Sequence, residues 1–196
     1  TGLMTRLASH DHTIEVRQLT RRDEIGEMAR ALQVFKEMAI ETDGQNWVKS
    51  SVTAISNKLQ EATTYSEFAG TLMSELATCL HAGLCVFYAR RGDAGRFELL
   101  GSYGYKEQGQ APRTYGPGEG LVGQAALERR AIVLHDVPDD YARIHSATGE
   151  APPRSVVLLP VLSRGNVLGV IEAASFAPLT ELQQRLLDEL MPIVAL

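Results

Sequence analysis

Apolar residues recur at alternating steps of three and four in two stretches near the start of the chain. The first follows Thr20-Arg21-Arg22-Asp23, which resembles a capping box with Asp in place of Glu and predicts a helix that begins near Thr20. Its apolar positions have heptad spacing: Ile25, Met28, Leu32, Phe35 and Ala39. The second stretch repeats that spacing: Val48, Val52, Ile55, Leu59 and Ala62. Only another helix covers so narrow a stripe, so we expect both to form the seam of a parallel homodimer.

The two stretches are out of phase. Nine residues separate Ala39 from Val48, a gap that heptad-ordered steps do not supply and that contains Asp43-Gly44. Two arrangements fit: the helix ends at Gly44, or it continues with its seam rotated, as in a stammer. Upstream, alternating apolar residues predict an extended connector over residues 9–19, and residues 1–8 predict the tail of an earlier helix.

Beyond residue 63 the pattern becomes that of an α+β domain. Thr64-Tyr65-Ser66-Glu67 is a capping box that opens a helix, which we expect Gly83 to end. Period-two alternation around polar, glycine-containing turns predicts one hairpin over residues 84–103 and another over 154–176. The expected fold is therefore an antiparallel sheet flanked by helices and preceded by a helical, coiled-coil segment.

Three further segments complete this prediction. Residues 120–130 predict a short helix and residues 132–135 a strand. Residues 136–155 hold three prolines and little regular pattern, and loops of this length in compact domains are often binding loops or lids. Thr180-Glu181-Leu182-Gln183 caps a last helix, which Pro192 is expected to kink or end.

Residues 19–39 resemble the second helix of a HAMP domain. The likeness is carried by Asp23-Glu24-Ile25-Gly26 and by the apolar heptad positions that follow it. The resemblance implies that residues 1–42 are a partial HAMP domain, which retains only the tail of that family's first helix. In this family the module receives motion from a transmembrane helix and passes it onward.

Residues 47–196 resemble a GAF domain. Three segments carry the likeness: Gly118 to Gly123, Val157 to Val161 and Val167 to Glu172. The opening Trp47-Val48-Lys49 and the closing run up to Val194 resemble GAF units of membrane-bound hybrid sensor histidine kinases. We therefore assign residues 43–196 to a GAF-like sensor domain whose helical N-terminal segment spans residues 47–63.

Together these resemblances imply the cytoplasmic part of an inner-membrane sensor histidine kinase of a two-component phosphorelay. HAMP would pass motion through a dimeric GAF domain to a kinase core outside this chain. An alternative is a small-molecule-binding GAF receptor of another signalling protein, such as a cyclase, phosphodiesterase or chemoreceptor. A GAF-type sulfoxide reductase is a third interpretation. Since the chain begins at Thr1 and Leu196 lies within a helical pattern, we expect a piece of a longer protein.

Composition narrows the classes of partner. The 196 residues carry 19 Lys and Arg against 24 Asp and Glu, and the net charge of −5 disfavours non-specific binding to nucleic acid. No apolar run approaches the ~20 residues of a membrane span, so we expect membrane contact only through segments that precede this chain. Two cysteines are too few for a disulfide framework, which favours a reducing, cytoplasmic setting.

No catalytic or metal-binding pattern is recognisable. The five histidines lack metal-ligand spacing, and none begins a phosphoacceptor box. Cys79 and Cys85 have the apolar neighbours typical of structural thiols. Gly118 to Gly123 fits the dinucleotide pattern G-x-G-x-x-G, but no buried strand precedes it, which favours a tight turn before a helix. We expect no catalytic residue, no metal site and no cofactor that the sequence requires.

A ligand pocket is predicted where tyrosines and histidines border the long loop. Tyrosine combines an apolar face with a polar tip, arginine binds carboxylates, and Glu172 interrupts an apolar strand. The predicted pocket residues are Tyr103, Tyr115, His135, Tyr141, His145, Arg154 and Glu172. Near them in sequence are Tyr105, Arg113 and Arg143. The alternative is that these are ordinary loop tyrosines and solvated arginines.

Overall fold

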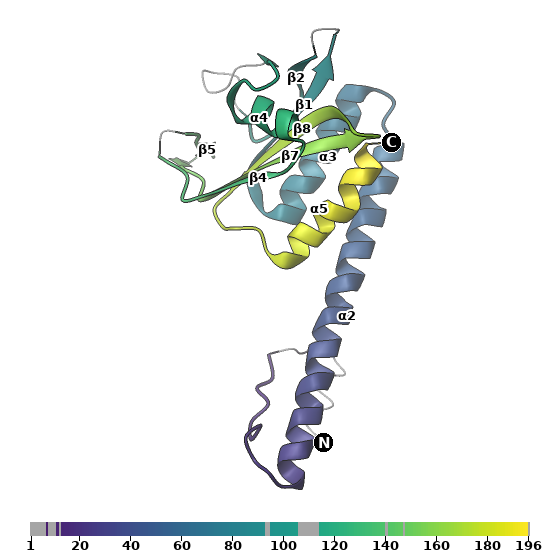
Figure 1. Cartoon of the computed structure of the whole chain (residues 1–196), viewed down its shortest axis with the longest axis vertical. Helices are drawn as coiled ribbons and strands as arrows, with labels where there is room; N and C mark the ends of the chain where they lie inside the picture. The colour runs from purple at the N-terminus through teal and green to yellow at the C-terminus, as the bar shows by residue number, and fades with distance from the viewer. Residues whose placement is uncertain are drawn as a thin grey trace. The chain divides into compact units, whose positions relative to one another are not determined.

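The computed structural model describes residues 7, 11, 13–92, 95–105, 114–139, 141–146 and 148–195. It contains two compact units, residues 1–50 and residues 51–196, which are described in turn. Helix α2 (Glu24–Gln60) begins in the first unit and ends in the second (Figure 1). The predicted domain boundary between residues 42 and 43 falls inside this helix. Within the described residues, no helix combines the length and apolar character needed to cross a membrane.

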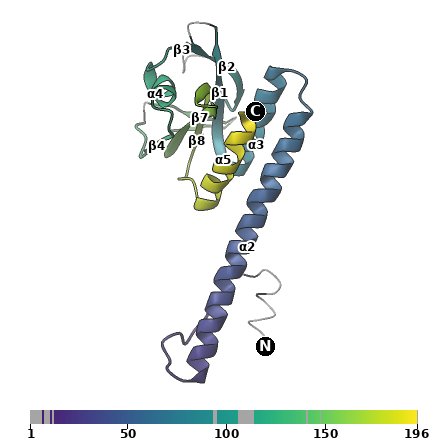
Figure 2. The same cartoon turned by 45° about the vertical axis from the view of Figure 1, so that its right-hand side comes forward.

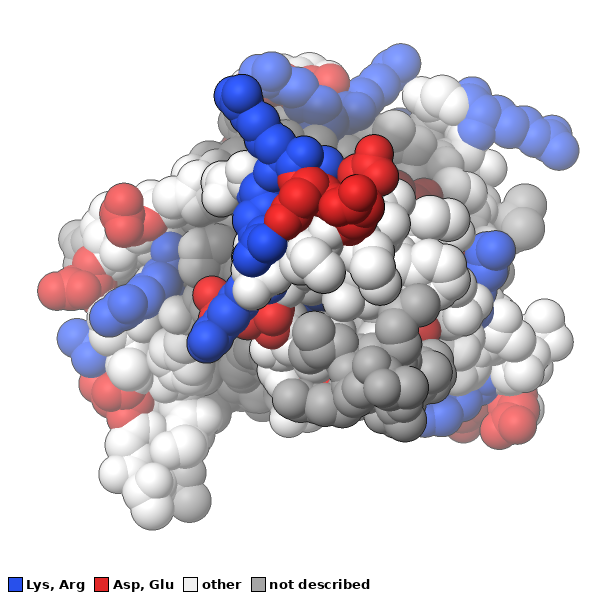
Figure 3. All heavy atoms as spheres, turned by 90° about the horizontal axis from the view of Figure 1, so that it is seen from below, with Lys and Arg blue, Asp and Glu red and all other residues white. Residues whose placement is uncertain are grey.

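The first unit consists of the start of α2 and a connector beside it. Ile14 and Val16 are buried, and the Lys36 ammonium group donates to the Ile14 carbonyl at 2.6 Å. The connector is non-helical over the described residues 13–19, as its alternation predicts. Of the predicted helix over residues 1–8, all but Leu7 lies outside the described residues. On the face in Figure 3, acidic and basic side chains are interspersed.

Helix α2 begins at Glu24, later than the predicted start near Thr20. Asp23 takes the capping role: its Oδ1 accepts a hydrogen bond from the Gly26 N–H at 3.1 Å, and its carboxylate pairs with Arg21. The prediction was wrong because the side chain that accepts from the free N–H groups of the first turn sets the helix start. That side chain belongs to Asp23 and not to Thr20.

Helix α2 continues through Asp43-Gly44, so the second of the two predicted arrangements is the one observed. The two heptad stretches differ in exposure. In the first, Met28 and Phe35 are 70% and 60% exposed. In the second, Ile55 and Leu59 are buried in the core of the second unit. This corrects the predicted seam: Ile55 and Leu59 pack within their own chain, so they are not available to a partner helix.

The second unit is built on a six-stranded antiparallel sheet with the order β3-β2-β1-β8-β7-β4. Its strands are β1 (Ala82–Arg91), β2 (Arg96–Tyr103), β3 (Thr114–Tyr115), β4 (Ile132–His135), β7 (Ser155–Ser163) and β8 (Asn166–Ser175). The pairs β1–β2 and β7–β8 confirm the two predicted hairpins, and β4 confirms the predicted short strand. In the centre of the sheet β1 pairs with β8, which joins the two hairpins.

Helices cover both faces of this sheet, which confirms an α+β fold. The helices are α3 (Tyr65–Leu80), α4 (Gly120–Glu128) and α5 (Glu181–Val194). Figures 1 and 2 show α3 and α5 on one side of the sheet and α4 on the other. Alternate residues of β1 divide accordingly: Cys85 and Phe87 pack with α3 and α5, whereas Val86 and Tyr88 face the α4 side.

The helix ends agree with the sequence in part. Thr64 caps α3 through the Glu67 N–H, but the Glu67 carboxylate accepts from Thr63, so the predicted capping box is only half formed. The helix ends at Leu80 with His81 in a left-handed conformation at φ 52°; Gly83, the predicted terminator, lies in β1. For α5 the capping box is complete, and the helix runs past Pro192 to Val194.

The predicted loop over residues 136–155 contains a small hairpin of β5 (Ile144–His145) and β6 (Glu150–Ala151). It packs against β1 at Gly83, where an added Cβ would lie 2.3 Å from Ile144 Cγ2. Glycine at this position therefore allows the hairpin to approach the sheet on the side that carries the cavity described below.

Candidate ligand-binding cavity

A cavity of about 310 Å³ lies on the α4 side of the sheet. Strand β1 supplies an apolar wall, the first turn of α4 supplies a second wall, and the segment around β5 supplies a third. The lining residues are Leu84, Val86, Tyr88, Gly104, Tyr105, Tyr115, Gly120, Leu121, Val122, Tyr141, Ala142, Arg143, His145 and Glu172. All of them lie in the second unit.

Glu172 projects from β8 into this cavity, opposite Val86 of β1 in the strand register. Its Oε1 accepts a hydrogen bond from the Tyr141 hydroxyl at 3.2 Å. Burial raises the pKa of the Glu172 carboxyl, while the hydrogen bond from Tyr141 acts in the opposite direction. The pKa of Tyr141 is raised as well, first by burial and then by the neighbouring negative charge of Glu172. The carboxylate and the phenol thus form one coupled pair.

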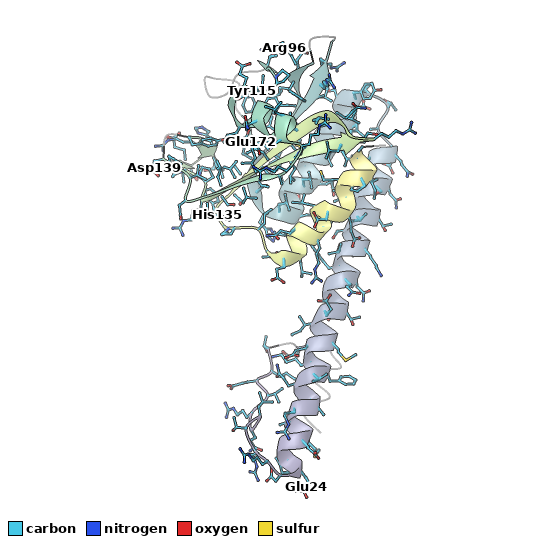
Figure 4. All side chains as sticks on the ribbon, viewed as in Figure 1. Glu24, Arg96, Tyr115, His135, Asp139 and Glu172 are labelled. Carbon is cyan, nitrogen blue, oxygen red and sulfur yellow. The ribbon has the colours of Figure 1, made fainter. Side chains whose placement is uncertain are left out.

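Tyr88 and Tyr115 form a second pair in the cavity. Their ring centroids are 5.2 Å apart and their planes are nearly perpendicular, an edge-to-face arrangement that aromatic rings favour. Burial raises the pKa of both phenols; their mutual hydrogen bond raises that of Tyr88 and lowers that of Tyr115, as expected for a donor and its acceptor. Figure 4 places Tyr115 near Glu172 on the α4 side of the sheet.

Charged groups of the small hairpin border the cavity at a third place. The Glu150 carboxylate lies 3.2 Å from Arg143 Nη1 and 3.0 Å from His145 Nδ1. His145 and Glu150 are direct partners in the β5–β6 register, which fixes this geometry. The Arg143 charge therefore has a partner on the same hairpin.

The glycine pattern at residues 118–123 shapes the turn that leads into α4. Gly118 and Gly120 have φ values of +77° and +59°, which favour glycine. At Gly123 an added Cβ would lie 2.2 Å from the Gly116 carbonyl oxygen. Backbone conformation and close packing account for all three glycines, in agreement with the predicted tight turn.

The sequence model of the GAF domain family matches residues 62–196. The chain belongs to the GAF domain family. The match begins after residues 19–39, so the resemblance of that segment to HAMP stays a prediction. No curated protein matches the chain.

Solved structures share this GAF fold. The GAF domain of an Acinetobacter phosphoenolpyruvate-protein phosphotransferase is 17% identical, with 76% of this chain and 90% of that chain covered and a TM-score of 0.62. The GAF domain of such a phosphotransferase from Coxiella burnetii is 18% identical, with coverages of 76% and 90% and a TM-score of 0.63. A free methionine-R-sulfoxide reductase from Neisseria meningitidis, in complex with its substrate, is 23% identical, with coverages of 76% and 86% and a TM-score of 0.60.

The GAF cavity brings together part of the predicted pocket. The predicted residues that line it are Tyr115, Tyr141, His145 and Glu172. Tyr103 is 44% exposed, and His135 and Arg154 are exposed and outside the lining. His135 lies on the edge strand β4, and Figure 4 shows it apart from Tyr115 and Glu172. These three predictions were wrong because nearness in sequence to the long loop does not set the direction of a side chain.

Two lining residues that were considered only as neighbours, Tyr105 and Arg143, also reach the cavity, whereas Arg113 lies outside the described residues. Tyr88 was missed altogether. Its position two residues after Val86 on β1 places it on the same face as Glu172, which faces Val86 across the strand pair. The alternation of β1 was visible in the sequence, but its pairing with a strand more than 80 residues away was not.

Neither cysteine of the chain lines the GAF cavity. Cys85 faces the helical side of the sheet, and burial raises the pKa of its thiol to about 12. Cys79 lies on α3, and partial burial likewise raises the pKa of its thiol. Both thiols are therefore protonated near neutral pH, the unreactive form of cysteine. Within the described residues, no group of three or more side chains is arranged to hold a metal ion.

Proposed function

We propose that this chain is the sensory part of a signalling protein and that its GAF cavity binds a small molecule. The observation that carries the proposal is the cavity itself. Its volume of about 310 Å³ falls within the range of ligand sites, and its lining combines an apolar wall with a few convergent polar groups, as such sites do. One structure of the same fold is that of a complex with its substrate.

The sheet gives such binding a route to the helices. Val86 and Tyr88 of β1 line the cavity, while Cys85 and Phe87 of the same strand pack in the core shared by α3, α5 and residues 51–60 of α2. Because protein interiors are close-packed, a ligand that shifts β1 also shifts what packs behind it. We propose that α2 and α5 carry the response.

In its fuller form, the proposal makes the chain a relay of a two-component sensor histidine kinase, as the cytoplasmic portion of an inner-membrane protein. The HAMP-like residues 19–39 and the continuity of α2 support this context. A GAF receptor of a cyclase, phosphodiesterase or chemoreceptor is the alternative. Incubating the full-length protein with labelled ATP separates them, because only a histidine kinase would acquire acid-labile phosphate.

The proposal assigns a binding role to the cavity and no catalytic residue. A sulfoxide reductase of the kind predicted as a third interpretation needs a thiolate beside its substrate. Cys85 lies on the opposite face of the sheet and its burial keeps it protonated, so the cavity geometry gives that interpretation no support. We further propose that the chain forms a homodimer through parallel α2 helices.

A thermal-shift screen of nucleotides, amino acids, organic acids and organic amines tests ligand binding. A ligand at about 100 times its Kd stabilises the folded state by about 2.7 kcal/mol, so the melting temperature should rise by several degrees. Ala142→Phe fills the cavity and should abolish the shift; Ala131→Phe, at an exposed position outside the lining, is the matched control. If no compound class shifted either protein, ligand binding would be contradicted and a ligand-free relay favoured.

A further inference from the structure

We propose that the GAF cavity recognises an organic ammonium ion, held between tyrosine rings and the Glu172 carboxylate. The inference rests on the proposed function and names the chemistry of its ligand. It starts from one juxtaposition inside the cavity: Tyr88, Tyr105, Tyr115, Tyr141 and Glu172. Aromatic rings around a negative charge are the chemistry that recognises ammonium groups.

The five side chains come from separate parts of the fold and form one cluster. Tyr88 and Tyr115 contact each other edge to face, and the Tyr141 hydroxyl lies 3.2 Å from Glu172 Oε1. The charge of Glu172 acts on the phenols of Tyr88, Tyr115 and Tyr141, and Tyr105 in turn acts on Tyr88 and Tyr115. A ligand in the cavity therefore meets these groups together.

The hydrogen bonds of the cluster give this end of the cavity a negative character. The Tyr141 hydroxyl donates to Glu172, and the Tyr88 hydroxyl donates to Tyr115, so these two O–H groups are already used. Oxygen lone pairs and the electron-rich ring faces are what they leave for a ligand. A carboxylate can accept about four hydrogen bonds, and the bond from Tyr141 takes one of these positions.

The basic groups of the lining lie at the β5 end of the cavity. Arg143 and His145 both pair with Glu150 of their own hairpin, at 3.2 Å and 3.0 Å. Their charge is thus opposed locally and leaves the tyrosine cluster to Glu172. An anionic ligand placed among the tyrosines would meet a carboxylate, whereas a cation would meet an opposite charge and ring faces.

Burial of Glu172 gives the cation a thermodynamic role. An ionised carboxylate in a partly apolar cavity is costly unless it has a charged partner. An ammonium group on the ligand would supply that partner and would also contact the tyrosine rings, an interaction that strengthens when water is excluded. Ligand and carboxylate would then stabilise each other.

Calorimetric titration of the whole chain with matched probes tests the inference. The cations are choline and n-butylammonium; their neutral analogues are 3,3-dimethylbutan-1-ol and n-butanol, and butyrate is the anion. At least one cation should bind about tenfold or more tightly than its neutral analogue, because the analogue keeps the shape and loses the charge. Equal binding of cation and analogue, or preference for butyrate, would overturn the inference.

Variants locate the charge. Glu172→Gln keeps the side-chain shape and the acceptor for Tyr141, and should weaken the cation by about tenfold or more, while Glu98→Gln, at an exposed position on β2, should not. Tyr115→Phe keeps the ring and should bind within about threefold of the wild type, whereas Tyr115→Leu should bind more weakly. Unchanged cation binding by Glu172→Gln would count against the cluster. Circular dichroism verifies that each variant is folded.

The two proposals fail in distinguishable ways. A neutral or anionic ligand whose thermal shift is lost in Ala142→Phe would leave the sensory cavity standing and overturn the ammonium inference. The absence of a shift with these probes and with every class in the screen would contradict both.

Discussion

At the scale of single residues, Glu172 is the side chain in which fold and function are most closely linked. Its neighbours along β8, Ile171 and Ala173, are buried in the helical core, and its own side chain enters the cavity. Burial raises the pKa of its carboxyl, which means that the ionised form is destabilised relative to the unfolded chain. The free protein therefore keeps this group at a cost in stability.

That cost should appear in the pH dependence of unfolding. Because the folded-state pKa of Glu172 is raised, its stabilising contribution is complete below the ordinary value of 4.5 and is lost as pH rises through the folded-state pKa. Glu172→Gln removes this dependence, so its free energy of unfolding should gain on the wild type as pH rises above about 4.5. Urea unfolding at pH 5 and pH 8 measures this gain, and Glu98→Gln controls for loss of charge alone. A constant difference between variant and wild type would contradict the expectation.

At the scale of elements, the hairpin β5–β6 closes one side of the cavity from a segment that looked irregular in sequence. Its place depends on Gly83 of β1, since an added Cβ there would collide with Ile144. Ile144 is itself buried with Val86 and Tyr88 in the core on the α4 side. The hairpin is therefore held by packing against the sheet as well as by its own hydrogen bonds.

Gly83→Ala tests this dependence. Forcing a methyl group into a filled site typically costs about 1–3 kcal/mol, and here it should also displace the hairpin and weaken any ligand of the cavity. Gly70→Ala on α3 is the matched control: no atom lies within 4 Å of an added Cβ there, so it should be neutral or stabilise by up to about 1 kcal/mol. Chemical denaturation measures both effects. Equal stability of the two variants would show that the hairpin adapts without cost.

At the scale of the whole molecule, the exposed heptad residues of α2 bear on assembly. Ile25, Met28 and Phe35 lie on the exposed part of the predicted seam, where a second copy would cover them. Ile55 and Leu59 are committed to the core of their own chain. The proposed dimer contact therefore concentrates on the first half of the helix.

Replacing Phe35 with Glu should weaken this dimer. A charge in the seam of two parallel helices is buried against its own symmetry mate, which disfavours association. Val34→Glu is the matched control, because Val34 is exposed on the same turn but off the heptad seam. Light scattering coupled to size exclusion should give a dimer for the wild type and the control, with Phe35→Glu shifted toward the monomer. A monomeric wild type at high concentration would contradict the dimer.

Much of the fold was predictable because it depends on local periodicity. The change from steps of three and four to alternation marked where helices give way to strands, and the capping residues Thr64 and Thr180 marked two helix starts correctly. The positions that failed, Thr20 and Gly83, are ones where several residues nearby offer the same local signal. Packing then selects Asp23 as the cap and draws Gly83 into β1.

The sequence by itself determined the α+β order of elements, the hairpins, the tight glycine turn and the GAF-like character of the chain. The tertiary structure alone decided whether α2 continues through Gly44, which heptad residues are buried, and which side chains share the cavity. The physical reason is that hydrophobic period and capping act within a few residues. The pairing of Val86 with Glu172 and the docking of Ile144 on Gly83 join distant segments, and only the folded chain brings them together.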